Sequence, residues 1–511
     1  MPRPAPGSPE ELAAFEGLKA RLPGLFHSVS VDDRLPHTVV VVPSLSLEQS
    51  ELAKISGVHH YEERLLYMLM LLRRPRTRLV FVTSQPLNPS VVDYYLHLLS
   101  GVPTNHARRR LTLLSCLDAS AIPLTAKILD RPMLQQRIRD AVGDLDSSHI
   151  SVFNSSPLER SLSVALGIPL YANDPALQSL GSKSGCRELF RDAGVTFPDG
   201  FERLRDAGDI TEALDSLKGR HPEMRRAVVK LNEGFSGEGN ALFYFDGCPE
   251  SGDRKAWIRE NLPQLRFEAP RETWESFEAK YEEMQGIVEL FIEGSPKESP
   301  SCQARVNAVG EAMTISTHDQ VLGGPSGQVF MGCTFPARED YRVDIQEAGF
   351  RVAKVLAGKG VVGRFATDFV SVKDKDDRWV HYAIEVNLRK GGTTHPFLTL
   401  KFLTDGTYDH TTGLFHTPQG PAKYYYASDT LHSDLYRGLS PDDLVEYAVY
   451  HGLHFHGASE RGVVFHLMGA LSEFGKLGVV CIGDNHQQAR FLYNKTVGVL
   501  DAVSKDLHGD R

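Results

Sequence analysis

The sequence is poor in the features that mark secreted, membrane and nucleic-acid-binding proteins. Its six cysteines among 511 residues are scattered and form no CxxC pair, which predicts reduced thiols in the cytoplasm rather than a disulfide framework. The longest apolar run, Leu65 to Leu72, is far shorter than a membrane span, and the N-terminus lacks the apolar core of a signal peptide. The net charge of −9 offers no basic excess for a phosphate backbone. We therefore expect a cytoplasmic protein with no membrane or nucleic-acid partner.

The N-terminal third contains no glycine fingerprint for a dinucleotide, and no internal repeat is visible. A Pro-rich start precedes a helix expected from Glu10 to Leu22. The apolar runs Thr38 to Val42 and Leu79 to Thr83 predict buried strands, and Tyr61 to Leu72 has the length and content of a helix. Strands alternating with helices predict an α/β layer over about residues 25 to 175. In the absence of a dinucleotide fingerprint, we expect this layer to give structural support or to form one wall of a substrate site.

A glycine-rich hairpin is predicted between two apolar strands in Ala227 to Phe245. Lys230 lies on the first strand, just before a loop that contains Gly234, Gly237 and Gly239. Such a loop can close over a triphosphate through its backbone N–H groups, although a plain hairpin explains the glycines equally well. Upstream, Lys183 begins a predicted helix, where a solvated surface lysine is the ordinary interpretation.

The segment Ile287 to Pro296 reads as a strand that leaves its sheet and becomes a linker. Its free backbone groups could read an adenine edge, and Glu293 or Glu298 could reach a ribose. An edge strand with solvated carboxylates is the simpler alternative. Further on, Arg305 is an isolated cation on a predicted strand, and His318 stands in a polar triplet beside a glycine turn.

Three oxygen-bearing side chains are expected to meet on a two-stranded ribbon. Asp368 lies in the middle of the strand Arg364 to Val372, and the turn KDKDD leads to a return strand that carries Glu385 and Asn387. Glu385 and Asn387 are two residues apart and therefore share a face. Carboxylates there are costly unless something binds them, and Mg²⁺ is the natural candidate. A surface strand that runs into a polar loop is the alternative.

A polar, cationic loop follows the ribbon directly. Arg389 and Lys390 precede the small and hydroxylated residues Gly391 to His395, a composition suited to an anion. Metal ligands beside an anion loop suggest phosphate chemistry.

The C-terminal hundred residues contain predicted helices from Pro441 to Tyr450 and from Gln487 to Asp506. The string HGLHFHG holds His451, His454 and His456, which lack a Cys or carboxylate partner at ligand spacing. They predict a polar patch near an acceptor site rather than a zinc site.

The order of these features resembles the ATP-grasp superfamily over about residues 175 to 405. Lys183, Lys230 with its glycine hairpin, an acidic hinge, and then Asp368, Glu385 and Asn387 follow one another as in that family. The resemblance implies an α+β fold, with a core of two α+β lobes that hold MgATP between them. It implies these divisions: a flexible N-terminus and helix (1–24), an α/β pre-ATP-grasp domain (25–172), the ATP-grasp core (173–410) and a small α/β C-terminal domain (411–511).

The same resemblance assigns ligands. Lys183 and Lys230 would hold the α- and β-phosphates, and one or two Mg²⁺ ions would be held by Asp368, Glu385 and Asn387. The remaining nucleotide contacts implied are the hairpin residues Gly234, Ser236, Gly237 and Gly239 and the hinge residues Glu289, Phe291, Ile292 and Glu293.

A narrower resemblance connects three strings, STHDQVLGGPSGQVFMGCTFPA, IEVNLRKGGTTHPF and GVVFHLMGALSEFGKLGVVCIGD, with the family of the pheganomycin peptide ligase. It implies an ATP-dependent ligase that joins a small carboxylic or amino acid to an amine or peptide through an acyl phosphate. Arg389 and Arg305 would stabilise the transferring phosphoryl group, and His318 and His395 would contact the amine. Two alternatives stay open: an ATP-grasp kinase, and a nucleotide-binding protein without catalysis. The oligomeric state is also open, a homodimer included.

Overall fold

A parallel sheet forms the core of the N-terminal third. The computed structural model describes residues 4–32, 34–47, 49–234, 239–249, 252–269, 271–323 and 329–508. The sheet has the strand order β3-β2-β1-β4, and all its pairs are parallel. Its central strand β1 (His37–Val42) is buried throughout, as its run of four valines predicts. The other strands are β2 (Thr77–Thr83), β3 (Leu111–Ser115) and β4 (Ser148–Val152).

Helices cover both faces of this sheet. The 3-10 helix η1 (Val58–Arg73) packs on one face, and α6 to α8 pack on the other. The helix expected from Glu10 to Leu22 is in fact two helices, because α1 ends at Lys19 and a second begins at Leu22 beside Pro23. The helices are α1 (Pro9–Lys19), α2 (Leu22–Val31), α3 (Gln49–Ala53), α4 (Pro89–His97), α5 (Thr104–Arg108), α6 (Leu124–Leu129), α7 (Pro132–Val142) and α8 (Pro157–Leu166).

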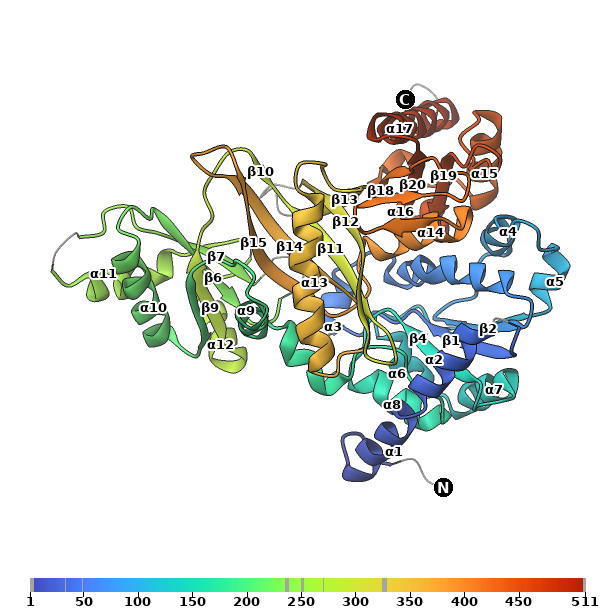
Figure 1. Ribbon diagram of the computed structural model, residues 1–511, viewed down its shortest axis with the longest axis horizontal. Helices are drawn as coiled ribbons and strands as arrows, with labels where there is room; N and C mark the ends of the chain where they lie inside the picture. The colour runs from blue at the N-terminus through green and yellow to red at the C-terminus, as the bar shows by residue number, and fades with distance from the viewer. Residues whose placement is uncertain are drawn as a thin grey trace.

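A separate lobe, at the left of Figure 1, is built on an antiparallel sheet with the order β5-β9-β6-β7-β8. The glycine hairpin is confirmed as the connection between β6 and β7, with Lys230 paired to Asn240. Ser236 and Gly237 lie outside the described residues. The elements are η2 (Pro175–Gly181), α9 (Lys183–Asp192), β5 (Gly200–Leu204), α10 (Ala207–Arg220), β6 (Arg226–Leu231), β7 (Asn240–Tyr244), α11 (Arg254–Asn261), η3 (Leu262–Gln264), β8 (Arg266–Phe267), α12 (Trp274–Met284) and β9 (Gly286–Leu290).

A large antiparallel sheet forms the centre of the molecule (Figure 1). Its order is β10-β14-β11-β12-β13-β18-β20-β19, and β15 pairs with β14. Its elements up to residue 404 are β10 (Lys297–Glu298), β11 (Pro300–Val306), β12 (Ala312–Gly323), β13 (Val329–Phe335), α13 (Arg342–Gly358), β14 (Gly363–Lys373), β15 (Trp379–Asn387) and α14 (Thr394–Thr404).

The C-terminal hundred residues continue this same sheet. Strand β18 pairs with β13, so the boundary expected at residue 410 lies within one continuous sheet. The predicted helix Pro441–Tyr450 is confirmed as α15. The elements are β16 (Thr407–Asp409), β17 (Leu414–His416), β18 (Tyr424–His432), η4 (Asp434–Tyr436), α15 (Pro441–Tyr450), β19 (Gly462–His466), η5 (Met468–Ala470), α16 (Leu471–Phe474), β20 (Lys476–Gly483) and α17 (His486–His508).

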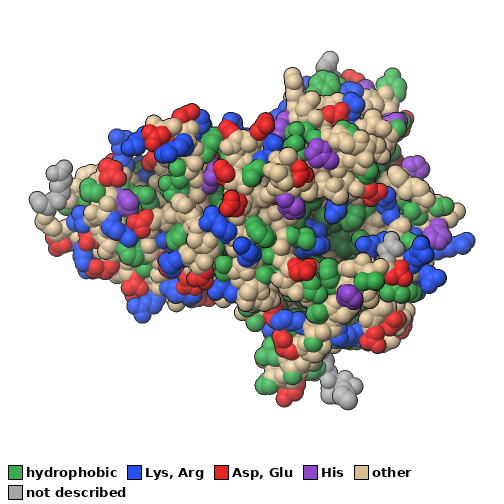
Figure 2. Space-filling model, in the orientation of Figure 1, with side chains coloured by type: hydrophobic (Ala, Val, Ile, Leu, Met, Phe, Trp, Pro, Cys, Tyr) green, Lys and Arg blue, Asp and Glu red, His purple; other side chains and the backbone are tan. Residues whose placement is uncertain are grey.

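The large sheet presents opposite chemistry on its two faces. The odd-numbered residues Phe365 and Phe369 of β14 join the apolar cluster that α13 covers. The even-numbered residues Arg364 and Asp368 therefore point to the other face. Figure 2 shows Lys and Arg interspersed with Asp and Glu over the visible surface, which is hollowed beside the N-terminal layer. No described helix is both long and apolar enough to cross a membrane.

Candidate nucleotide and metal site

The two-stranded ribbon brings the three predicted metal ligands together. Asp368 on β14 lies directly opposite Glu385 on β15, and Asn387 lies opposite Ala366. The Asn387 side-chain amide donates a hydrogen bond of 2.9 Å to Asp368 Oδ2. The structure thus has the pairing of Asp368 with Glu385 that the KDKDD turn predicts.

The charges on this ribbon suit a divalent cation. Burial, and then the neighbouring negative charge of Glu385, raise the pKa of Asp368 to about 6. Burial acts to raise the pKa of Glu385 too, but the charge and hydrogen bond of Lys183 lower it overall. Two facing carboxylates with an amide beside them form a hard oxygen donor set, so the residues present fit Mg²⁺.

Lys183 lies on α9, whose apolar residues Leu189 and Phe190 share a core with β14 and β15. It is the first residue of α9, and Ser182 caps that helix by accepting a hydrogen bond from the backbone N–H of Gly185. Its ammonium forms an ion pair with Glu385. From its sequence position alone, Lys183 would be a solvated surface residue. In the structure it is instead half-buried against a predicted metal ligand.

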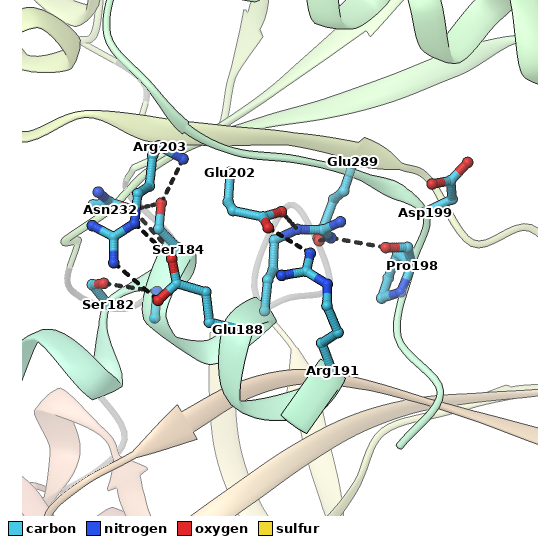
Figure 3. Close-up of polar contacts among 12 residues, drawn as sticks. Ser182, Ser184, Glu188, Arg191, Pro198, Asp199, Glu202, Arg203, Asn232 and Glu289 are labelled. Atoms are coloured by element: carbon cyan, nitrogen blue, oxygen red, sulfur yellow. Dashed lines mark hydrogen bonds and ion pairs between the residues drawn. The ribbon is translucent and has the colours of Figure 1, made fainter. Parts of the chain in front are cut away.

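Polar contacts fix α9 against the antiparallel lobe (Figure 3). The backbone N–H and the hydroxyl of Ser184 donate to Asn232 Oδ1 at 2.9 and 2.7 Å. Asn232 directly follows β6, the strand of Lys230, and its amide in turn donates to the Met284 carbonyl at 3.0 Å. The helix start that carries Lys183 and the strand end that carries Lys230 are thus held together.

Lys230 forms a buried ion pair with Glu289 on the neighbouring strand β9. The distance from Lys230 Nζ to Glu289 Oε1 is 2.5 Å, and Arg187 Nη1 lies 3.2 Å from Glu289 Oε2. Glu289 was expected in a hinge that contacts the nucleotide, but it lies on a strand, and its contact with the nucleotide stays a prediction. The strand continues through Glu289 and ends at Leu290, so its side chain lies in the core beside the candidate phosphate lysine.

The hinge itself begins at Phe291. The Arg226 guanidinium carbon lies 3.8 Å from the centre of the Phe291 ring, and the Lys297 ammonium lies 4.2 Å from it. Ile292 is buried, and its carbonyl accepts a hydrogen bond of 2.9 Å from Lys297. Glu293 pairs with Arg226 at 2.8 and 3.0 Å, an exposed pair that a ribose could displace at little cost.

Arg389 is the predicted catalytic residue nearest the ribbon. Burial lowers its pKa, and the charges of Glu385 and Asp368 oppose that shift, which places the guanidinium close to both carboxylates. Arg305 lies elsewhere, because it pairs with Arg364, four residues before Asp368 on β14. The structure therefore separates the two arginines that were expected to act together.

The two predicted histidines occupy different surroundings. His318 is fully buried, contacts the Phe335 and Tyr425 rings, and forms a 2.5 Å hydrogen bond with the Tyr425 hydroxyl. Burial lowers its pKa to about 3, so it is a neutral core residue, and the predicted contact with an amine is wrong. His395 is buried with its ring 4.2 Å from that of His466, and the ring nitrogens of both have no hydrogen-bond partner among the described residues.

Several side chains near the site were not predicted. Gln303 on β11 donates to the Thr393 carbonyl at 2.9 Å and accepts from Thr394 at 3.0 Å, which fixes the loop after Lys390. Arg64 on η1 pairs with Asp429 at 2.6 Å, and its charge acts on Arg389 and His395. These partners come from distant parts of the chain, so no local motif marks them.

The C-terminal histidines show no metal geometry. The rings of His454 and His456 are 6.4 Å apart. Within the described ranges, no group of three or more His, Cys, Asp or Glu side chains is placed to hold a metal ion. The Asp368–Glu385 ribbon supplies two carboxylates and completes its donor set with the amide of Asn387.

Comparison with known proteins identifies the family. The family model "IQCH-like, ATP-grasp" matches residues 175–250 and 257–411, and the model "PGM1 C-terminal domain" matches residues 443–496. The L-propargylglycine–L-glutamate ligase of Streptantibioticus cattleyicolor is 31% identical over 459 residues, which cover 88% of this chain and 92% of that protein. The chain belongs to the ATP-grasp superfamily.

A more distant relative and two solved structures also match. IQ motif-containing protein H of Danio rerio is 22% identical, over 91% of this chain and 48% of that protein. Biotin carboxylase from Campylobacter jejuni, solved with an ATP analogue, matches with a TM-score of 0.52 at 12% identity, over 89% of each chain. The ADP complex of N5-carboxyaminoimidazole ribonucleotide synthetase has a TM-score of 0.50 at 12% identity, over 92% of this chain and 98% of that one. The expected α+β ATP-grasp fold, with its parallel N-terminal layer, is confirmed.

Proposed function

We propose that this ATP-grasp protein is an ATP-dependent carboxylate–amine ligase that forms an amide bond between amino acids or short peptides. The observation that carries the proposal is the set of groups around Glu385, which faces Asp368 on the ribbon and pairs with Lys183 at the start of α9. The Streptantibioticus relative is by name an amino-acid ligase, which supports amino acids as substrates. The three strings that resemble the pheganomycin ligase family point the same way.

Nucleotide binding would use two lysines whose ammonium groups are paired with carboxylates in the structure. Lys183 and Lys230 each bind a carboxylate in the structure, and both would turn to the phosphates of ATP. Asp368, Glu385 and Asn387 would hold Mg²⁺, which when bound supplies charge neutralisation on the phosphate oxygens. The hinge residues Phe291 to Glu293 would contact the base and ribose.

The proposed reaction has two steps, formation of an acyl phosphate and its attack by the amine. A carboxylate oxygen of the acid bonds to the γ-phosphorus as the bond to the β–γ bridging oxygen breaks, and ADP leaves. The amine nitrogen then bonds to the acyl carbon, the carbon–oxygen bond to phosphate breaks, and the nitrogen loses a proton. Arg389, beside Asp368 and Glu385, stabilises the negative charge that the transferring group carries. Positioning supplies most of the remaining rate, because an acyl phosphate is already activated.

The experiment is a product screen with MgATP and a mixture of amino acids and dipeptides. Mass spectrometry should find an amide product, and ADP and Pi should form in equal amounts only when an acid and an amine are both present. Asp368→Asn and Glu385→Gln should each abolish turnover. Asp376→Asn, in the turn of the same ribbon, is the matched control and should leave turnover unchanged. A phosphorylated product without free Pi would instead identify a kinase.

A further inference from the structure

Four cationic side chains gather beside the site face of the large sheet, at a distance from the three predicted metal ligands. Arg305 on β11 and Arg364 on β14 lie directly opposite each other in the strand register. Lys390 follows the ribbon and reaches Ser151 of the N-terminal layer, and Lys401 lies at the exposed side of the cluster. Burial lowers the pKa of both lysines, and the positive charge of Arg364 adds to the lowering. We call these four residues the cationic cluster.

Two tyrosines from the N-terminal layer complete the surroundings. Tyr67 lies on η1, and Tyr171 lies after α8 in the segment that runs beside β4; both act electrostatically on Arg364. Both hydroxyls are buried and have no hydrogen-bond partner among the described residues. The cluster therefore lies where the N-terminal layer meets the large sheet.

In the part of the chain that the structure describes, no carboxylate pairs with the cluster. The groups that act on Arg364 are Arg305 and the two tyrosines, and the charges that act on Lys390 and Lys401 are arginines. Arg364 Nη1 and Arg305 Nε are buried without a hydrogen-bond partner in the described part of the chain. Within the described ranges, the Lys390 ammonium donates to Ser151 Oγ and the Val152 carbonyl, both of which are neutral. Holding partly buried like charges together without a counter-charge is costly, and an anion would remove that cost.

We propose that the cationic cluster binds an anionic group of a substrate, a carboxylate or a phosphate, that is separate from the group that reacts. The inference rests on the proposed ligase function, for which it specifies a dianionic substrate. Guanidinium groups bind both anions through paired hydrogen bonds, and two unpartnered tyrosine hydroxyls can donate as well.

The spacing suits one small molecule. Arg364 and Asp368 are four residues apart on β14 and share a face, so their Cα atoms are separated by about 13 Å. Long side chains reach in from both ends, because Arg389 lies beside the ribbon and Lys390, the next residue, lies beside the cluster. A dicarboxylic amino acid or a short acidic peptide can therefore bridge the distance with its reacting end at Asp368 and its other anion at Arg364.

The test measures binding by calorimetry to the MgADP-loaded full-length protein, with matched probes. L-Glutamate and L-glutamine have the same shape and differ in one charge, and O-phosphoserine replaces the distal carboxylate with a phosphate. We expect L-glutamate or O-phosphoserine to bind at least tenfold more tightly than L-glutamine, and the tighter of the two identifies the anion. Equal affinity for all three would overturn the inference.

Variants then assign the preference to the cluster. Arg364→Met and Lys390→Met should each reduce the preference for the dianion at least tenfold, whereas Arg364→Lys should keep part of it. Arg259→Met, on the exposed surface of α11, should change nothing. Thermal unfolding should show Arg364→Met at least as stable as the parent, because it removes an unpaired buried charge. An undiminished preference in Arg364→Met would overturn the assignment.

The binding measurements, taken together with the product screen, separate this inference from the ligase proposal. If the parent protein prefers the dianion but forms no amide from any acid and amine, the ligase proposal fails and the anion site stands. If amide forms equally well from L-glutamine and L-glutamate, the ligase stands and the anion site fails.

Discussion

The buried Lys230–Glu289 pair offers a quantitative test of how the nucleotide site is held without nucleotide. Lys230 and Glu289 are 7% and 3% exposed, and Glu289 is the one described residue to which the Lys230 ammonium donates a hydrogen bond. Glu289→Gln therefore leaves a buried ammonium without a carboxylate, which costs about 3–5 kcal/mol of unfolding free energy. Lys230→Met is milder, at about 1–2 kcal/mol, because Glu289 keeps Arg187 at 3.2 Å.

The double variant makes the comparison specific. When both partners are replaced, no unpaired lysine remains, so the loss should fall short of the sum of the single losses by about 2 kcal/mol. Urea unfolding of this lobe can be followed by fluorescence in a Trp379→Phe background, because the other two tryptophans, Trp257 and Trp274, lie on α11 and α12. ADP should stabilise Glu289→Gln more than the parent, since its phosphates then meet a free ammonium. Losses that add within about 0.5 kcal/mol would refute the pairing.

Two further changes test the fold around the site. Burial raises the pKa of Glu62 to about 7, so its contribution to stability is complete below pH 4.5 and lost as pH rises through 7. Glu62→Gln should match the parent near pH 4.5 and exceed it at pH 8 by up to about 3 kcal/mol in urea unfolding, and equal curves at both pH values would contradict this. Gly286→Ala places a Cβ 2.2 Å from the Lys230 carbonyl oxygen and 2.4 Å from the Tyr281 ring. It should cost more than about 2 kcal/mol and weaken ADP binding, whereas Gly358→Ala, with open space around it, should not.

The sequence predicted best those features that are local. The Asp368–Glu385 pairing follows from a short turn between two strands, and the start of α9 at Lys183 follows from a capping serine. The buried strand β1 likewise follows from its run of valines.

Contacts between distant segments were not predictable in this way. Strand β13 pairs with β18, and the two strands lie on either side of the domain boundary expected at residue 410. The boundary therefore falls within one continuous sheet. His318 was expected at the substrate because its neighbours are polar, yet Tyr425, a hundred residues later, fixes it in the core. The cationic cluster could not be predicted for the same reason, because Arg305 and Arg364 lie side by side only through the register of β11 with β14.

Transfer of a labelled oxygen tests the central proposal most directly. Amino acids labelled with ¹⁸O at both carboxyl oxygens are incubated with MgATP and an amine acceptor. Mass spectrometry then measures the ¹⁸O content of the phosphate and of the peptide. An acyl phosphate mechanism places one ¹⁸O in each Pi released and leaves one in the new amide, and Asp368→Asn should yield neither product. Unlabelled Pi, or a phosphorylated product with no free Pi, would contradict the assignment as a carboxylate–amine ligase.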